Sequence, residues 1–377
     1  MSRPKELIIV RQKYTPFGGG ERFLAQAMQA LADQGMRIRI LCRDWEGNAD
    51  YSITRLPVGS LTRRMRDKAF AKMACRHIEA SGDVLVQSHE RIPCCDIYRA
   101  GDGVHREWLA QRARKRGRLS RLLGRISPYH RYILAAERRL FESKRLKAVI
   151  CNSYMVKNEI QNHFDVPDEK FAVIHNGVDS LRFHPGLSEK YRTDLRKELG
   201  IPQNALIYLF VGSGFERKGL DSLLKAFKTT DSNSRLLIVG KDRHSSRYQK
   251  KAVKLGIGNQ VHFLGAQIDV APYYGVADVF VLPTLYDPLP NALLEAMACG
   301  LPVITSLKCG GIDLIKNNQN GLLCDALDIG HIADHMARCA DARLRKRLGS
   351  GAQKTVAALT VEDMSEAFQA LYANLTR

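Results

Sequence analysis

The sequence has no apolar run that approaches the length of a membrane span. A transmembrane helix needs about 20 predominantly apolar residues, whereas the first apolar stretch is confined to residues 7–10. That stretch is also too short for the hydrophobic core of a secretory signal peptide. These two absences predict a cytoplasmic protein.

The nine cysteines lack the spacing of a metal-binding or redox centre. No C-x-x-C pair is present, and Cys94 and Cys95 are adjacent, so neither a zinc ribbon nor a redox motif is indicated. We expect reduced and mostly buried thiols. A D-x-D motif is also missing, and we therefore expect no bound metal.

Acidic residues are few, because 39 Asp and Glu oppose 58 Lys and Arg, which leaves a net charge of +19. This excess implies an anionic partner: nucleic acid, an anionic membrane surface or a polyanionic substrate. The cations gather in residues 55–76 and 106–147, and the second stretch holds fourteen Lys or Arg against three acids. The charge leaves the choice among these partners open.

Length and periodicity predict two α/β domains. A chain of 377 residues exceeds the size at which one hydrophobic core keeps growing. The first half alternates short apolar runs with helical patterns, which is typical of a parallel sheet with helices on both faces. Its predicted strands are residues 7–10, 37–42, 83–87, 148–151 and 171–175, and its predicted helices are 21–33, 63–80, 129–144 and 154–163.

Glycine and proline interrupt this pattern between residues 177 and 202, which favours a linker there. The alternation then resumes and predicts a second doubly wound domain. Residues 361–375 are amphipathic and predict a final helix that packs across the domain boundary. The predicted elements of the second domain are strands at 206–211, 236–239, 261–264 and 278–282 and a helix at 220–228.

Two glycine-containing loops join a predicted strand to a predicted helix. The first holds Gly18 and Gly19, where the backbone can approach a diphosphate at the helix N-terminus. It is neither a G-x-G-x-x-G fingerprint nor a P-loop, and a simple tight turn is the alternative. The second holds Arg217 and Lys218, which are placed to neutralise phosphate charge. A solvated cation pair is the alternative there.

The segment from residue 287 to residue 304 is the most specific part of the sequence. Asp287 and Glu295 bracket a loop and the first turns of a helix, so both carboxylates can face one ligand. A carboxylate accepts two hydrogen bonds at once, which suits vicinal ribose or hexose hydroxyls. The loop N–H groups between them can meet a phosphate.

With these motifs in order, the chain resembles the retaining glycosyltransferases of family four, which have the GT-B fold. The family's acid–seven residues–Glu motif resembles Asp287 to Glu295, and its Arg-Lys pair resembles Arg217 and Lys218. Residues 175–179 match the usual entry to the second domain. The first acid of the motif is usually Glu, whereas this chain has Asp287. The resemblance implies that the donor nucleotide sugar is bound by Gly18, Gly19, Arg217, Lys218, Asp287, Leu289, Asn291 and Glu295.

The resemblance also implies an α/β architecture of two Rossmann-like domains that face a central cleft. Residues 1–175 would bind the acceptor, residues 176–355 would bind the nucleotide sugar, and residues 356–377 would form a terminal helix that crosses back to the first domain. Such an enzyme needs no divalent metal or other cofactor, because cations stabilise the leaving diphosphate. Front-side attack and a covalent intermediate both remain open.

The amino-terminal half is similar to the glucosyltransferases of the lipopolysaccharide core. The similarity rests on residues 14–19, 44–47, 97–102 and 127–132. It implies UDP-glucose as the donor and a heptose of the lipid-anchored, phosphorylated inner core as the acceptor. Another glycolipid or an exopolysaccharide is the alternative acceptor. The side chains that would act in catalysis are Asp102, Arg217, Lys218 and Glu295, and a turn-forming Asp is the alternative role for Asp102.

The basic stretch from residue 106 to residue 147 interleaves apolar residues with cations, as an interfacial helix requires. We expect it to hold the protein on the inner face of the cytoplasmic membrane or on the phosphorylated acceptor. A solvated helical face is the alternative. The expected contact residues are Arg112, Arg114, Lys115, Arg116 and Arg118.

Three other functional classes compete with this interpretation. A nicotinamide dehydrogenase shares the doubly wound sheets, but the first loop lacks its fingerprint. A nucleic-acid binder would use the charge, but no recognised module is present and only 7% of the residues are aromatic. We therefore expect no nucleic-acid partner. A sugar-nucleotide epimerase or a phosphorylase keeps the fold with different chemistry, and product analysis with and without an acceptor separates these.

Overall fold

The computed structural model describes residues 6–14, 35–46, 51–59 and 62–375, and for residues 116–126 it describes the helical backbone only. The chain divides into two compact units. Unit 1 comprises the residues up to 176 together with the segment from residue 361 onward, and unit 2 comprises residues 177–360.

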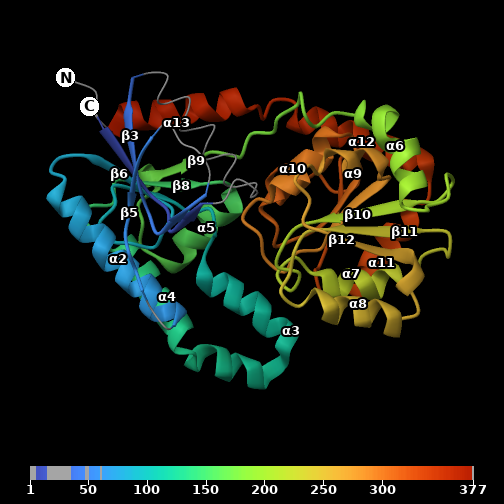
Figure 1. Ribbon diagram of the computed structural model, residues 1–377, viewed down its shortest axis with the longest axis horizontal. Coiled ribbons are helices and arrows are strands. Elements are labelled where there is room, and N and C mark those ends of the chain that lie inside the picture. The colour runs from blue at the N-terminus through green and yellow to red at the C-terminus, as the bar shows by residue number, and fades with distance from the viewer. Residues whose placement is uncertain (1–5, 15–34, 47–50, 60–61, 376–377) are drawn as a thin grey trace. The chain divides into compact units, whose positions relative to one another are not determined.

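Unit 1 is built on a seven-stranded parallel sheet with the order β5-β3-β1-β6-β7-β8-β9 (Figure 1). Apolar runs such as that of β1 are buried throughout, as a sheet covered on both faces requires. β2 and β4 form a separate two-stranded parallel ladder. The strands are β1 (Glu6–Val10), β2 (Lys13–Tyr14), β3 (Arg37–Cys42), β4 (Asp44–Trp45), β5 (Ser52–Arg55), β6 (Leu85–Ser88), β7 (Ile97–Arg99), β8 (Ala148–Cys151) and β9 (Phe171–Val173).

The helices of unit 1 cover its sheet, and α2 and α4 pack against each other (Figure 1). Thr62 caps α2, because its hydroxyl accepts the backbone N–H of Met65. Ser153 caps α5 in the same way through Val156. The helices among the described residues of unit 1 are α2 (Arg63–Ala80), α3 (His105–Ile126), α4 (Pro128–Phe141), α5 (Tyr154–His163) and α13 (Val361–Leu375), with a short 3-10 turn, η1 (Asp168–Lys170).

The final helix, α13, belongs to unit 1 although it follows the whole of unit 2 in sequence. Met364, Phe368 and Tyr372 are buried in the same apolar cluster as Leu7 and Ile9 of β1. The Tyr372 hydroxyl also donates to the Gln87 side-chain oxygen at the end of β6. The helix therefore closes one face of the first sheet.

Unit 2 repeats the doubly wound plan with a six-stranded parallel sheet of order β12-β11-β10-β13-β14-β15. The order reverses between β10 and β13, and this switch point is where such sheets bind ligands. The strands are β10 (Ile207–Val211), β11 (Arg235–Val239), β12 (Val261–Gly265), β13 (Val279–Leu282), β14 (Val303–Ser306) and β15 (Leu322–Cys324).

Helices cover both faces of this sheet: α7, α8 and α11 lie on one side, and α9, α10 and α12 lie on the other (Figure 1). α6 packs on α9. The helices are α6 (Leu187–Glu198), α7 (Leu220–Phe227), α8 (Ser245–Lys254), α9 (Ala271–Val276), α10 (Asn291–Ala298), α11 (Ile329–Arg338) and α12 (Ala342–Val356), with 3-10 turns η2 (Gly258–Gln260) and η3 (Gly310–Asp313).

Two expectations from the sequence are corrected. The stretch from residue 177 to residue 202 is not a linker throughout, because α6 lies within it and buries Leu187 and Leu195 in the core of unit 2. The thiols are not all reduced, because a disulfide joins Cys75 of α2 to Cys94 of the β6–β7 loop. The other seven cysteines are free and buried.

Candidate functional site

Arg217 and Lys218 lie in the loop between β10 and α7, at the carboxyl end of the unit 2 sheet. Arg217 Nε donates to the Tyr286 carbonyl at 2.8 Å. The Arg217 carbonyl accepts the Thr284 hydroxyl at 2.9 Å and the Leu285 N–H at 2.8 Å. Both ends of Arg217 are thus fixed to the loop that follows β13, which lies beside β10 in the sheet.

Gly219 permits this close approach of the two loops. It adopts the left-handed conformation with φ +76°, which is strained for a residue with a side chain. A Cβ atom at this position would lie 1.8 Å from the Pro283 carbonyl oxygen. A glycine immediately before α7 therefore holds Lys218 against the end of β13.

Asp287 is the centre of this arrangement. Its side chain is only 7% exposed and forms an ion pair with Lys218 Nζ, while one guanidinium nitrogen of Arg217 lies 3.9 Å from its other oxygen. Its backbone is held on both sides, because its N–H donates to the Lys308 carbonyl and its own carbonyl accepts the Gly310 N–H. The structure therefore brings together three of the residues singled out in the sequence.

Leu289, Asn291 and Glu295 follow on the loop and helix after Asp287. Leu289 is buried, whereas Asn291 begins α10 and is half-buried. Glu295 Oε2 accepts the Tyr274 hydroxyl of α9 at 2.7 Å, which orients the carboxylate. The first N–H groups of α10 follow Pro290, and a helix start of this kind presents donors to an anion.

The cluster in unit 2 combines two fixed cations with a buried carboxylate. Burying a carboxylate is costly unless cations compensate it, and Lys218 and Arg217 do so here. A guanidinium and an ammonium at the end of a parallel sheet can neutralise a diphosphate, and carboxylates nearby can bind sugar hydroxyls. The site is therefore suited to a nucleotide diphosphate that carries a sugar.

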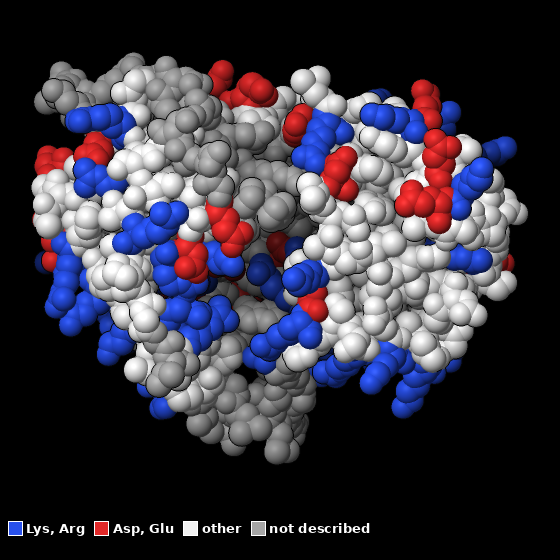
Figure 2. All heavy atoms as spheres, viewed as in Figure 1, with Lys and Arg blue, Asp and Glu red and all other residues white. Residues whose placement is uncertain are grey.

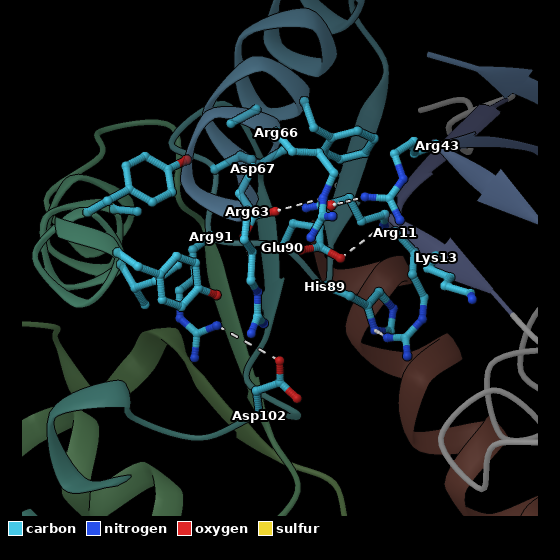
Figure 3. Close-up of a pocket in the computed structure, with 18 residues that line it drawn as sticks. Arg11, Lys13, Arg43, Arg63, Arg66, Asp67, His89, Glu90, Arg91 and Asp102 are labelled. Atoms are coloured by element: carbon cyan, nitrogen blue, oxygen red, sulfur yellow. Dashed lines mark hydrogen bonds and ion pairs between the residues drawn. The ribbon is translucent and has the colours of Figure 1, made fainter. Parts of the chain in front are cut away.

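Asp102 lies in unit 1, in the loop between β7 and α3 (Figure 3). The Gly103 N–H donates to the Ala100 carbonyl, so Asp102 also occupies a tight turn. Its carboxylate is 70% exposed and lies 3.8 Å from Arg91. Asp102 can therefore form the turn and still present its carboxylate to a ligand, because the side chain is exposed.

Two residues that the sequence did not single out hold this loop. Glu137 of α4 is buried, and its Oε1 accepts both Arg91 Nε at 2.9 Å and the His105 N–H at 2.8 Å. Arg91 also donates to the Gly103 carbonyl at 3.1 Å. The sequence contains no motif that would have identified these two residues. Residues 91, 103 and 137 are far apart in sequence and come into contact only in the folded unit.

His105 directly follows this loop as the first residue of α3. Its Nε2 lies 3.0 Å from His130 Nδ1, and Arg112 lies 3.2 Å from His130 Nε2. Burial, together with the neighbouring Arg91, lowers the pKa of His105 to about 3. His105 is therefore neutral at physiological pH and does not act as a cation for phosphate.

The basic residues expected at a membrane lie on α3. Arg112 is half-buried against His130, Arg114 is exposed and donates to Gln111, and Lys115 is half-buried. Arg116 and Arg118 lie on α3, and their side chains are outside the described part of the structure, as are Gly18 and Gly19 altogether. Figure 2 shows cations gathered on unit 1 around α2, where Arg63, Arg64 and Lys68 are exposed.

Within the described residues, no helix combines the length and the apolar character that crossing a bilayer requires.

Two family models match the chain one after the other. The model for Glycosyltransferase Family 4 matches residues 17–182, and the model for Glycosyl transferases group 1 matches residues 191–355. A lipopolysaccharide glucosyltransferase from Escherichia coli, WaaG, is 29% identical over 316 residues, which cover 82% of each chain.

Solved structures match the fold across nearly the whole chain. The crystal structure of WaaG superimposes with a TM-score of 0.85 at 25% identity, covering 97% of this chain and 99% of that one. Anabaena HepE, solved in complex with UDP-glucose, superimposes with a TM-score of 0.73 at 17% identity over 98% and 99% of the two chains, which shows a shared fold. The two glycosyltransferase models match successive parts of the chain, and the WaaG structure matches its two parallel sheets. The chain therefore belongs to the family four glycosyltransferases, which have the GT-B fold.

Proposed function

We propose that this glycosyltransferase moves glucose from UDP-glucose onto a heptose of the lipid-anchored lipopolysaccharide inner core, with retention of the anomeric configuration. The observation that carries the proposal is the cluster of Arg217, Lys218 and Asp287 at the switch point of the unit 2 sheet. The name of the Escherichia coli relative supports the acceptor class, and the UDP-glucose complex of Anabaena HepE supports the donor.

On the donor side, each residue has a separate task. Arg217 and Lys218 stabilise the charge that develops on the departing diphosphate. Asp287 orients the hexose together with the backbone N–H groups of Leu289 and Asn291, whereas Pro290 has no N–H to donate. Glu295, fixed by Tyr274, accepts the ribose hydroxyls.

On the acceptor side, Asp102 faces the acceptor hydroxyl. In front-side attack, the departing phosphate takes the hydroxyl proton as the new glycosidic bond forms and the bond to the diphosphate breaks. In the alternative with a covalent intermediate, a carboxylate first displaces the diphosphate and the acceptor oxygen then displaces the carboxylate. Retention results from either route.

A thermal-shift panel of nucleotide sugars tests the donor assignment. A ligand that binds only the native state stabilises it by about 2.7 kcal/mol at a concentration of 100 times its Kd. UDP-glucose is expected to raise the melting temperature more than GDP-mannose or ADP-glucose does. A larger shift with another nucleotide sugar, or no shift with any of them, contradicts the donor assignment.

Transfer is expected to survive excess EDTA. The reason is that Arg217 and Lys218 already supply the positive charge that a divalent ion supplies in other transferases. The measurement is the rate of UDP release in the presence of acceptor, with and without EDTA in excess over trace metal. Activity that is lost in EDTA and restored by magnesium or manganese contradicts this expectation.

The basic part of α3 is expected to attach the protein to anionic membranes. Each Lys or Arg near an anionic leaflet contributes about 1 kcal/mol, so a few are sufficient for reversible binding that salt weakens. The measurement is co-sedimentation with vesicles of graded anionic-lipid content. The test variant changes five residues to Ser: Arg112, Arg114, Lys115, Arg116 and Arg118.

A matched control removes the same charge from exposed positions of unit 2, by changing to Ser the residues Arg243, Arg247, Lys250, Lys254 and Lys346. The α3 variant is expected to lose binding to anionic vesicles while the control keeps it. Equal binding of the two variants, or equal binding of the wild type to neutral and anionic vesicles, removes α3 from membrane attachment.

A further inference from the structure

A cavity of about 730 Å³ opens in unit 1 at the carboxyl ends of its strands (Figure 3). Its wall includes residues that directly follow β1, β3 and β6, together with side chains of α2 and α4 and the Asp102 loop. This volume falls within the range of about 300–1,000 Å³ typical of small-ligand sites. The cavity therefore has room for one or two sugar rings.

The wall of the cavity is strongly cationic. Three carboxylates, those of Asp67, Glu90 and Asp102, face six basic side chains. Burial raises the pKa of Glu90, which weakens its negative charge, and burial lowers the pKa of His89 well below its usual value, so His89 is neutral. The six basic residues are Arg11, Lys13, Arg43, Arg63, Arg66 and Arg91.

Several of these cations already have strong partners. Arg91 is held by Glu137, and Arg43 donates from Nε and from a terminal nitrogen to Asp44 at 2.9 and 2.6 Å. Arg63 and Arg66 differ from Arg91 and Arg43 in this respect. Their Nε atoms lie 3.9 and 3.6 Å from the carboxylate oxygens of Asp67, and these distances are longer than hydrogen bonds. The buried Nε of Arg66 has no hydrogen-bond partner among the described residues.

The position of this pair in α2 makes its charge costly for the free protein. Arg63, Arg64 and Arg66 occupy the first turn of α2, which contains no acid. The N-terminus of a helix carries a partial positive charge, so acids are favoured there and cations are not. An anion at this helix start would offset the repulsion and meet two guanidinium groups, which bind phosphate and carboxylate in a bidentate manner.

Aromatic residues complete a wall suited to a sugar. Tyr129 and Tyr132 line the cavity, and the Arg63 guanidinium lies 4.6 Å from the centroid of the Tyr129 ring. Figure 3 shows Arg63 and Arg91 extending toward the space that Asp102 also faces. One ligand can therefore meet guanidinium groups at one side of the cavity and a carboxylate at the other.

We propose that Arg63 and Arg66 bind an anionic substituent of the acceptor saccharide, a phosphate monoester or a carboxylate, while Asp102 receives one of its hydroxyls. This inference rests on the proposed function and specifies its acceptor: the enzyme selects a charged sugar and not a neutral one. This subsite binds the charged group next to the reacting sugar, and it is separate from the proposed attachment of α3 to the membrane surface.

The test measures binding of three probes to the full chain: glucose, glucose 6-phosphate and glucuronate. Saturating UDP is present throughout, so that phosphate-containing probes are kept from the Arg217–Lys218 cluster. Ligand-observed NMR titration gives the Kd values. Glucose 6-phosphate or glucuronate is expected to bind at least 10-fold more tightly than glucose, and raising salt is expected to weaken only the charged probes.

The double variant Arg63→Gln and Arg66→Gln is expected to weaken binding of the charged probe at least 10-fold. The matched control, Arg64→Gln with Lys68→Gln, removes the same charge from exposed positions of α2 that do not line the cavity, and a change of less than 2-fold is expected. Arg63→Lys with Arg66→Lys keeps the charge but not the planar guanidinium groups, and the melting temperature of each variant shows whether folding is preserved. The better of the two charged probes identifies the substituent as phosphate or carboxylate.

Equal binding of glucose and both charged probes overturns the inference, and so does equal weakening in the Gln variant and its control. The melting shift produced by UDP-glucose is measured on the same samples. A lost anion preference with an intact UDP-glucose shift rejects this subsite alone, whereas an absent UDP-glucose shift in the wild type rejects the donor assignment.

Discussion

Replacing Lys218 with Ala is expected to lower kcat/KM for UDP-glucose about 100- to 1,000-fold, because the departing diphosphate loses a fixed cation. Lys218 pairs with the buried carboxylate of Asp287, so the substitution leaves Arg217 at 3.9 Å as the remaining cation of this pair. Removing one partner of a buried pair also costs about 3 kcal/mol of stability, and circular dichroism at the assay temperature must confirm folding.

Lys225→Ala is the matched control for this variant. Lys225 is in the same unit, and its partner Asp221 keeps a second ion pair with Lys251. We expect wild-type turnover in the control.

Glu295→Ala is expected to lower kcat/KM for UDP-glucose to a similar extent as Lys218→Ala, because it removes the carboxylate that Tyr274 orients. Wild-type turnover in both Lys218→Ala and Glu295→Ala contradicts the placement of donor binding in unit 2.

Asp102→Asn is expected to lower kcat about 100-fold or more while leaving the Kd for UDP nearly unchanged. The substitution keeps the shape of the side chain and the turn at Gly103 but removes the charge that faces the acceptor hydroxyl. Asn also retains the ability to form turns. A purely structural role of Asp102 would therefore leave turnover close to that of the wild type.

Asp83→Asn serves as the control, because Asp83 is an exposed acid in the turn before β6. The two variants have the same change in charge and lie in the same unit. Asp102→Asn is expected to lose transfer, whereas Asp83→Asn is expected to retain it. Equal activity of the two variants shows that Asp102 acts only in the turn.

The architecture follows from the sequence where hydrophobic periodicity is strong. The predicted strand at residues 37–42 and the helices at 63–80 and 154–163 have the same bounds as β3, α2 and α5. Short strands such as β15 were missed, because three residues between turns carry too little periodicity. The final helix was found because Met364, Phe368 and Tyr372 recur at the spacing of one helical face.

α6 was mistaken for a linker for a physical reason. Its sequence is highly charged, and one of its buried residues is Arg196, which is fully buried. The Arg196 guanidinium donates to the carbonyls of Pro202, Gln203 and Ala205 and pairs with Asp278. Hydrophobic periodicity treats every arginine as an exposed residue. It therefore could not identify the buried face of this helix, which includes Arg196.

The cluster of Arg217, Lys218 and Asp287 was predictable because its parts are short local motifs: two adjacent cations after one strand and two carboxylates around a helix start. The cavity of unit 1 was not predictable. Its basic residues come from the ends of three strands and from α2, and only the folded sheet brings Arg11, Arg43, Arg63 and Arg91 to one space. The disulfide between Cys75 and Cys94 was missed for the same reason, since it joins α2 to a distant loop.

The most direct test of the account is transfer to a defined acceptor. Purified protein is incubated with UDP-glucose, with and without lipopolysaccharide truncated before its first core glucose, and the product is examined by mass spectrometry and by NMR of the anomeric proton. We expect one hexose to be added to a heptose only when both substrates are present, in the anomeric configuration of the donor. An inverted product, or release of free glucose at the same rate with and without the acceptor, contradicts it.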